Sequence, residues 1–124
     1  MKHILRSWTF WIRLELGDEC REYLDRITLP RLRGAPGNLY ATALFRGLPD
    51  GTLEVVVASV WENLESIRGH AGEDLLQPSV EPEVRAKMVD RDIVVRHALI
   101  DPIDPAAGVP PETLRGGLSQ LPAA

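Results

Sequence analysis

The segment LEVVVASVWENLESI, residues 53–67, constrains the fold more than any other part of the chain. A run of β-branched and apolar residues ends at Trp61, and an acidic amphipathic helix with Asn63 as its N-cap follows at once. Side chains alternate along a strand, so residues 53, 55 and 57 point one way and residues 56, 58 and 60 the other. Both sets are apolar, so both faces of the sheet need cover. We expect the chain's own helices to cover one face and a second copy of the protein to cover the other.

Length and charge narrow the class of protein. The 124 residues suffice for one domain, and the net charge of -4 disfavours nucleic acid or an anionic membrane as a partner. No apolar run approaches the ~20 residues that span a bilayer, and the N-terminus lacks the pattern of a signal peptide. Cys20 is the only cysteine, which excludes an internal disulfide and favours a cytoplasmic protein. We expect Cys20 to be a small apolar residue on a helix face.

Alternating and periodic patterns predict seven elements. Strands are expected at residues 4–14, 39–46, 52–60 and 93–100, with a hairpin loop at 47–51. The first helix begins with Asp18 as its N-cap and is stopped by Pro30. Its buried stripe consists of Cys20, Tyr23, Leu24 and Ile27.

Two further helices are expected between the third and fourth strands. One follows Asn63, ends at Gly69 or Gly72 and has a buried edge of Leu64, Ile67 and Ala71. A short helix starts at Pro82 and carries Val84 and Met88 inward.

The order of elements predicts an α+β fold for residues 1–101, a ferredoxin-like βαββαβ antiparallel sheet with helices on one face. An uncovered apolar sheet face would cost several kcal/mol, comparable to the stability of so small a domain. A homodimer with its sheets packed face to face is therefore expected. Residues 102–124 form a Pro-rich C-terminal tail with one expected short helix at 112–121. A lid, a dimer clamp and a linker are the alternatives for this tail.

One stretch of the chain has a recognisable likeness. Residues 57–74, VASVWENLESIRGHAGED, resemble the strand-Trp-Glu-Ser-x-Glu-x-Ile…Ala-Gly-Glu-Asp pattern of antibiotic-biosynthesis-monooxygenase-like proteins of the dimeric α/β-barrel superfamily. Residues 94–97, 6–8 and 36–38 resemble the closing strand, the opening strand and the loop before the second strand of such proteins. The likeness covers roughly residues 4–100. The chain departs from the common pattern at Asn63, where Ser is usual, and at His70.

The resemblance implies a dimeric α/β barrel and a cofactor-independent enzyme that acts on an aromatic or polyketide-like small molecule by general base catalysis. The resemblance is compatible with a cofactor-free monooxygenase and with a cyclase or isomerase. Two alternatives stay open: a non-catalytic ligand-binding or assembly protein of the same fold, and a haem-binding or haem-degrading protein.

Two histidines are the candidate catalytic residues. His97 interrupts an otherwise apolar strand, where burial would keep the imidazole neutral and able to act as a general base. A core histidine bonded to backbone or water is the alternative. His70 lies at the end of the second helix, and we expect it to orient the substrate or to take part in catalysis unless it is a solvated cap.

Aromatic residues and arginines are the candidate substrate-binding residues. Trp61 and Trp8 would line a pocket for a flat apolar or aromatic ligand, and Trp11 lies on the opposite face of the first strand. Arg6 and Arg96 would bind a carboxylate or enolate unless they are solvated edge residues. Metal-ligand spacings, phosphate loops and nucleotide fingerprints do not occur, so no metal and no cofactor are expected.

Overall fold

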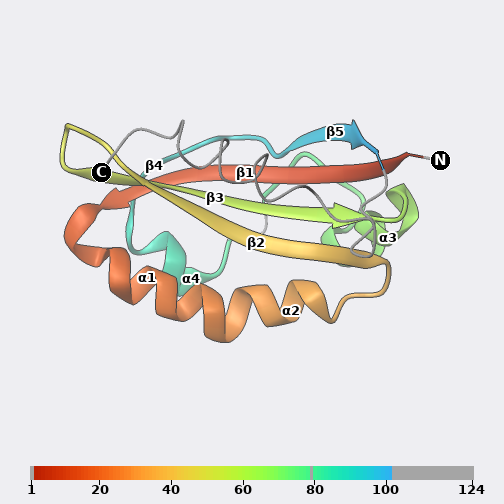
Figure 1. The fold of residues 1–124 in the computed structure, drawn as a ribbon, viewed down its shortest axis with the longest axis horizontal. Coiled ribbons are helices and arrows are strands. Elements are labelled where there is room, and N and C mark those ends of the chain that lie inside the picture. Colours follow the sequence, from red (N-terminus) through yellow and green to blue (C-terminus); the bar gives the residue numbers. More distant parts are fainter. Residues whose placement is uncertain (1, 79, 102–124) are drawn as a thin grey trace, which may run out of the picture.

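The computed structural model describes residues 2–78 and 80–101. The predictions for the tail 102–124 lie outside these residues. The described chain folds as an antiparallel sheet with helices on one side (Figure 1). Strand order is β2-β3-β1-β4, and β5 also pairs with β1. This arrangement confirms the α+β ferredoxin-like prediction.

The three long strands lie close to their predicted positions. They are β1 (His3–Arg13), β2 (Asn38–Gly47) and β3 (Thr52–Trp61). Continuous antiparallel pairing joins β1 to β3 from Ile4↔Trp61 to Arg13↔Thr52. The hairpin at 47–51 joins β2 to β3, as the sequence predicts.

The strand predicted at 93–100 is confirmed only for residues 96–100, and a second short strand before it was not predicted. Two short strands, β4 (Met88–Arg91) and β5 (Arg96–Ile100), pair in turn with the two ends of β1. Between them the chain turns inward, because the amide of Val95 donates to the carbonyl of Leu76 at 2.8 Å and the Val95 side chain is buried. Of the apolar residues before β5, only Val95 enters the interior, whereas Ile93 and Val94 are exposed.

The helical layer is longer than predicted. After the 3-10 turn η1 (Leu14–Leu16), helix runs through α1 (Gly17–Tyr23), the π-helical turn η2 (Leu24–Thr28) and α2 (Leu29–Arg33). Pro30 does not stop it, since the wider π turn precedes the proline and Pro30 stands in the first positions of α2, where no N–H is needed. Helix α1 also begins at Gly17, so Asp18 lies in its first turn and is not the N-cap.

Helices α3 (Leu64–Ala71) and α4 (Pro82–Arg85) complete the structure. The Asn63 side chain accepts a hydrogen bond from the amide of Ser66 at 2.9 Å, which confirms the predicted cap, and α3 ends at Gly72. Ile67 is buried, but Leu64 is exposed, because it lies at the N-terminus of a helix whose inner edge is set by Ile67. Val84 is buried as predicted, whereas Met88 begins β4 and is not part of the short helix.

Two clusters of buried side chains form the core between the sheet and the helices. The first includes Phe10, Ile12, Cys20, Leu24 and Val55. Burial raises the pKa of the Cys20 thiol to about 11, so it stays protonated and serves as an apolar core residue. The second cluster surrounds Trp61, which is fully buried; its other members are Ile4, Leu29, Leu32, Ala41 and Ile67.

The other side of the sheet carries a group of apolar side chains. Residues paired across β1, β2 and β3 share this side, and its apolar members are Leu5, Trp11, Tyr40, Leu44, Val56, Ala58 and Val60. We call them the open-face patch. Tyr40 and Leu44 are about half exposed. None of the helices in the described part of the chain is long and apolar enough to cross a membrane.

Gly37 holds the loop between α2 and β2 against α3. Its φ is +83°, and a Cβ there would lie 1.9 Å from Oγ of Ser66. Gly37→Ala is expected to lower the free energy of unfolding by roughly 2–3 kcal/mol, because positive φ and overpacking both penalise the side chain. Urea unfolding followed by circular dichroism measures the loss.

Gly51→Ala is the matched control. Gly51 has φ +84° but open space around it, so only the backbone strain of roughly 1 kcal/mol is expected. Equal losses for the two variants would contradict the packing of Gly37 against Ser66.

Candidate functional site

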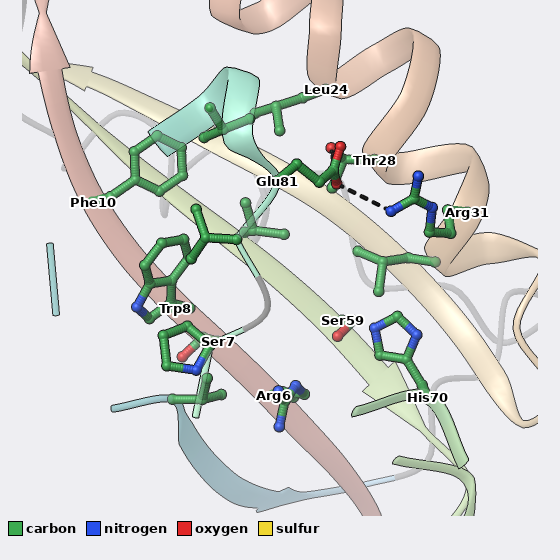
Figure 2. A pocket seen from close by; sticks show the side chains of 16 residues that line it. Arg6, Ser7, Trp8, Phe10, Leu24, Thr28, Arg31, Ser59, His70 and Glu81 are labelled. Carbon is green, nitrogen blue, oxygen red and sulfur yellow. Dashed lines mark hydrogen bonds and ion pairs between the residues drawn. The ribbon is translucent and has the colours of Figure 1, made fainter. Parts of the chain in front are cut away.

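A pocket of about 270 Å³ lies between the sheet and the helices (Figure 2). Its floor comes from β1 and β3, one wall from the helix that runs from α1 to α2, and the rest from His70 and the segment that carries α4. The apolar lining consists mainly of Trp8, Phe10, Leu24, Leu32, Val57 and Val84. The polar lining includes Arg6, Thr28, Arg31, Ser59, His70 and Glu81. The combination of apolar walls with a few polar groups is typical of small-molecule sites.

Trp8 and Phe10 form the aromatic wall. Both project from β1 on the helix-facing side, and their ring centroids are 5.2 Å apart. The indole N–H of Trp8 donates to the carbonyl of Asp92 at 2.7 Å, which fixes the plane of the ring. A flat ligand can therefore pack against an indole of fixed orientation.

His70 reaches the pocket from the last turn of α3. Its ring lies 5.2 Å from the indole of Trp61, and Figure 2 shows it near Arg6 and Ser59. Burial, and then the charges of Arg6 and Arg31, lower the pKa of His70 below its ordinary value of 6.5. The imidazole is thus neutral at pH 7 and can accept a proton.

At a second polar position, Glu81 connects the α4 segment to the long helix. Its carboxylate accepts hydrogen bonds from the hydroxyls of Thr28, at 3.0 Å, and of Tyr23. It also pairs with Arg31 at 3.5 Å. These contacts explain the raised pKa of Tyr23, which results first from its hydrogen bond to Glu81.

Three of the six predicted site residues line the pocket. These three residues are Trp8, Arg6 and His70. Trp61 lies beneath it, fully buried, and its Nε1–H donates to Oγ of Ser59 at 2.8 Å.

The two neighbouring predicted residues on β5 lie farther from the pocket. His97 stands beside Arg6, with its Nε2 2.9 Å from Nη1, and is outside the described lining. The side chain of Arg96 is 75% exposed and pairs with Asp92. On β1, Arg96 lies opposite Ser7, whereas His97 lies opposite Arg6. The expected contact of Arg96 with a ligand in this pocket therefore has no geometric support.

Sequence reasoning missed Ser59, Thr28, Arg31 and Glu81. Ser59 had a usable signal, since it shares the strand parity of Val57 and Trp61 on the helix-facing side. The contact between Thr28 and Glu81 joins residues 53 positions apart, and no local pattern marks such a pair.

The stability of the protein is expected to fall as the pH drops below about 6.5. Burial, followed by the charge of Arg6, lowers the pKa of both His70 and His97 in the folded state. The unfolded chain then binds more protons between the two pKa values, so acid favours unfolding. Urea midpoints at pH 7.5 and 5.5 measure the effect, and His70→Gln and His97→Gln are each expected to reduce the difference. An unchanged difference in both variants would contradict this assignment.

The sequence matches no family model, and no curated protein matches it. Solved structures do share the fold. A Bacillus cereus protein described as a candidate antibiotic biosynthesis monooxygenase superposes with a TM-score of 0.56 at 15% identity, over 84% of this chain and 98% of its own. The Streptomyces coelicolor monooxygenase from the gene ActVA-Orf6, solved with the ligand Nanaomycin D, gives 0.50 at 20% identity, over 89% and 93%. A Mycobacterium tuberculosis protein gives 0.51 at 16% identity, over 82% and 96%.

These likenesses define the class of protein by its fold. The chain has the ferredoxin-like α+β fold of antibiotic-biosynthesis-monooxygenase-like proteins, as the resemblance in residues 57–74 predicts. At identities of 15–20% these likenesses show the fold alone, so activity and substrate have to be argued from the residues of the site.

Proposed function

We propose that this protein is a cofactor-independent enzyme that acts on an aromatic or polyketide-like small molecule by general base catalysis. The observation that carries the proposal is His70, a neutral imidazole at a pocket that also holds Trp8 and Arg6. A neutral histidine beside a charged arginine can remove a proton while the arginine stabilises the negative charge that develops. One protein of this fold, the Streptomyces coelicolor monooxygenase, was solved with the ligand Nanaomycin D.

The simplest reaction of this kind converts an anthrone to a quinone. His70 takes one proton from the ring methylene, and the resulting carbanion passes electrons to O₂. One oxygen atom becomes the new carbonyl, and the other leaves as water with the two methylene hydrogens. Substrate supplies the four electrons, so the balance needs no further reductant. Trp8 and Phe10 would hold the planar ring system.

His97 is the less suitable base of the two predicted histidines. Arg6 has no lone pair to offer, so at 2.9 Å its Nη1–H donates and Nε2 of His97 accepts. Protonation of that nitrogen would break the bond and place two positive charges side by side. In this proposal His97 is a positioning residue that holds Arg6.

A second copy of the chain is part of the proposal. The open-face patch lies on the side of the sheet away from the helices, and two of its apolar side chains, Tyr40 and Leu44, are about half exposed. Sheet packing against a second copy would remove this area from water and stabilise both subunits. We infer a homodimer with its sheets face to face.

Oxygen uptake and quinone absorbance with 1,8-dihydroxy-9-anthrone test the function. We expect a rate at least about 100-fold above the uncatalysed oxidation, and a loss of most of this rate in His70→Gln. His3→Gln, a histidine away from the pocket lining, is the matched control and should keep the activity. A wild-type rate equal to the blank, with the ligand nevertheless bound, would favour a non-catalytic binding protein. Full activity in His70→Gln would remove His70 as the base.

A further inference from the structure

Arg6 is a buried cation without an anionic partner in the described chain. Its side chain lies in the floor of the pocket, and the residue is 8% exposed. Nη1 donates to the carbonyl of Leu75 at 2.7 Å and to Nε2 of His97 at 2.9 Å. Within residues 2–78 and 80–101, no carboxylate forms an ion pair with it. A buried guanidinium is strongly destabilising unless an anion or several dipoles compensate it.

The remaining donors of Arg6 are free to meet a ligand. Both recorded hydrogen bonds use Nη1, so Nε–H and the Nη2 hydrogens of the planar fork are left. The two bonds at Nη1 also hold the guanidinium in place, so little freedom is lost when an anion binds.

Ser59 supplies a second donor directly beside Arg6. The two residues are register partners on β1 and β3, and side chains opposite each other in such a pair lie on one face and close together. Oγ of Ser59 accepts the indole N–H of the buried Trp61 at 2.8 Å. One of its two lone pairs is thereby occupied, and its own hydrogen can point into the pocket. Arg6 and Ser59 therefore line the pocket as donors from adjacent strands (Figure 2).

The other charges of the pocket cancel each other. Arg31 pairs with Glu81 at 3.5 Å, and Glu81 also accepts from Thr28 and Tyr23. That carboxylate is fully engaged at another part of the lining, so one positive charge, on Arg6, is left over. The chain as a whole carries a net charge of -4, so this local excess of positive charge is not a property of the overall surface.

We propose that Arg6 and Ser59 form an oxyanion subsite that holds the ionised acidic oxygen of a ligand whose aromatic body packs on Trp8 and Phe10. The proposal rests on the proposed function in taking this pocket as the ligand site, and it adds the substrate class, an aromatic acid or an ionised phenol. Trp61 acts here as a positioning residue, since it fixes the direction in which Ser59 donates. The apolar end near Phe10 and Leu24 takes the part of the ligand remote from the charge.

Binding of 2-naphthoate and its neutral isostere 2-naphthamide, measured by titration calorimetry, tests the subsite. Hydrogen bonds to a charged group predict naphthoate binding about 10–100-fold tighter than the amide in the wild type. Ser59→Ala, a small change expected to fold, should lose about tenfold in naphthoate affinity with little change for the amide. Arg6→Gln should abolish the preference. Equal affinity for the two probes in the wild type, or a preference that survives both substitutions, would overturn the proposal.

Absorbance of bound 2-naphthol distinguishes the two sources of the anion. Appearance of the naphtholate band at pH 7 in the wild type, and its loss in Ser59→Ala, supports a subsite that also ionises phenols. Preference for naphthoate without that band supports the subsite and assigns it to carboxylates. These readouts need no turnover. A preference for naphthoate without quinone formation would support the subsite and contradict the proposed reaction. Quinone formation without a preference for naphthoate would contradict only the subsite.

Discussion

Trp61→Ala is expected to lower the free energy of unfolding by roughly 3–5 kcal/mol, the range for truncation of a large buried aromatic side chain. The indole is fully buried at the centre of the second core cluster, between the sheet and helices α2 and α3. Small domains are stable by only about 5–15 kcal/mol, so the variant will be partly unfolded at 37 °C or close to it. Urea unfolding followed by circular dichroism, at one fixed protein concentration because of the inferred dimer, measures the loss.

Trp8→Ala is the matched control for this loss. One side of the Trp8 ring already faces the pocket. In the variant, a water molecule can replace the indole N–H as the donor to the carbonyl of Asp92. A clearly smaller loss of stability is therefore expected, together with weaker binding of aromatic ligands. If Trp8→Ala destabilised the protein as much as Trp61→Ala, the division into a core tryptophan and a pocket tryptophan would be wrong.

The double variant Leu44→Lys/Val56→Lys is expected to be monomeric. The two residues are cross-strand partners in the middle of the open-face patch. Two ammonium groups buried without partners in a sheet-to-sheet interface would cost several kcal/mol, which weakens the dimer by more than about 100-fold. Analytical ultracentrifugation at micromolar concentrations measures the change in mass, and circular dichroism checks that the subunit stays folded.

Leu64→Lys provides the comparison. Leu64 is 46% exposed and Leu44 is 44% exposed, but Leu64 lies on α3 in the helical layer. The substitution Leu64→Lys should leave the oligomeric state unchanged. A wild-type protein that sediments as a monomer, or a double variant that remains dimeric, would contradict the inferred use of the open face.

Local patterns were enough to predict the three long strands of the sheet, β1, β2 and β3. Alternation in β1 and β3 and the Asn63 cap depend on neighbours within a few residues, so the sequence shows them directly. Pro30 and the split of the last strand could not be predicted in this way. In one case a π turn accommodates the proline, and in the other a contact between Val95 and Leu76 draws the chain inward.

The candidate site was only partly predictable for the same reason. Strand parity brings Arg6 and Trp8 to the same face as Phe10, and this part of the prediction needs no tertiary information. Whether His70 or His97 reaches the pocket depends on how α3 and β5 pack around Arg6. The single-strand pattern that singled out His97 carries no information about the neighbour that occupies its nitrogen.

The three tryptophans allow the most direct test of the central claim, that a small aromatic ligand binds between the sheet and the helices. Each indole N–H gives one signal in a ¹⁵N spectrum: Trp8 lies in the pocket wall, Trp61 donates to Ser59 beneath the pocket, and Trp11 lies on the open face. Titration with 2-naphthoate is predicted to shift the signals of Trp8 and Trp61 and to leave that of Trp11 in place. A shift of Trp11 alone, with Trp8 and Trp61 unmoved, would contradict the account.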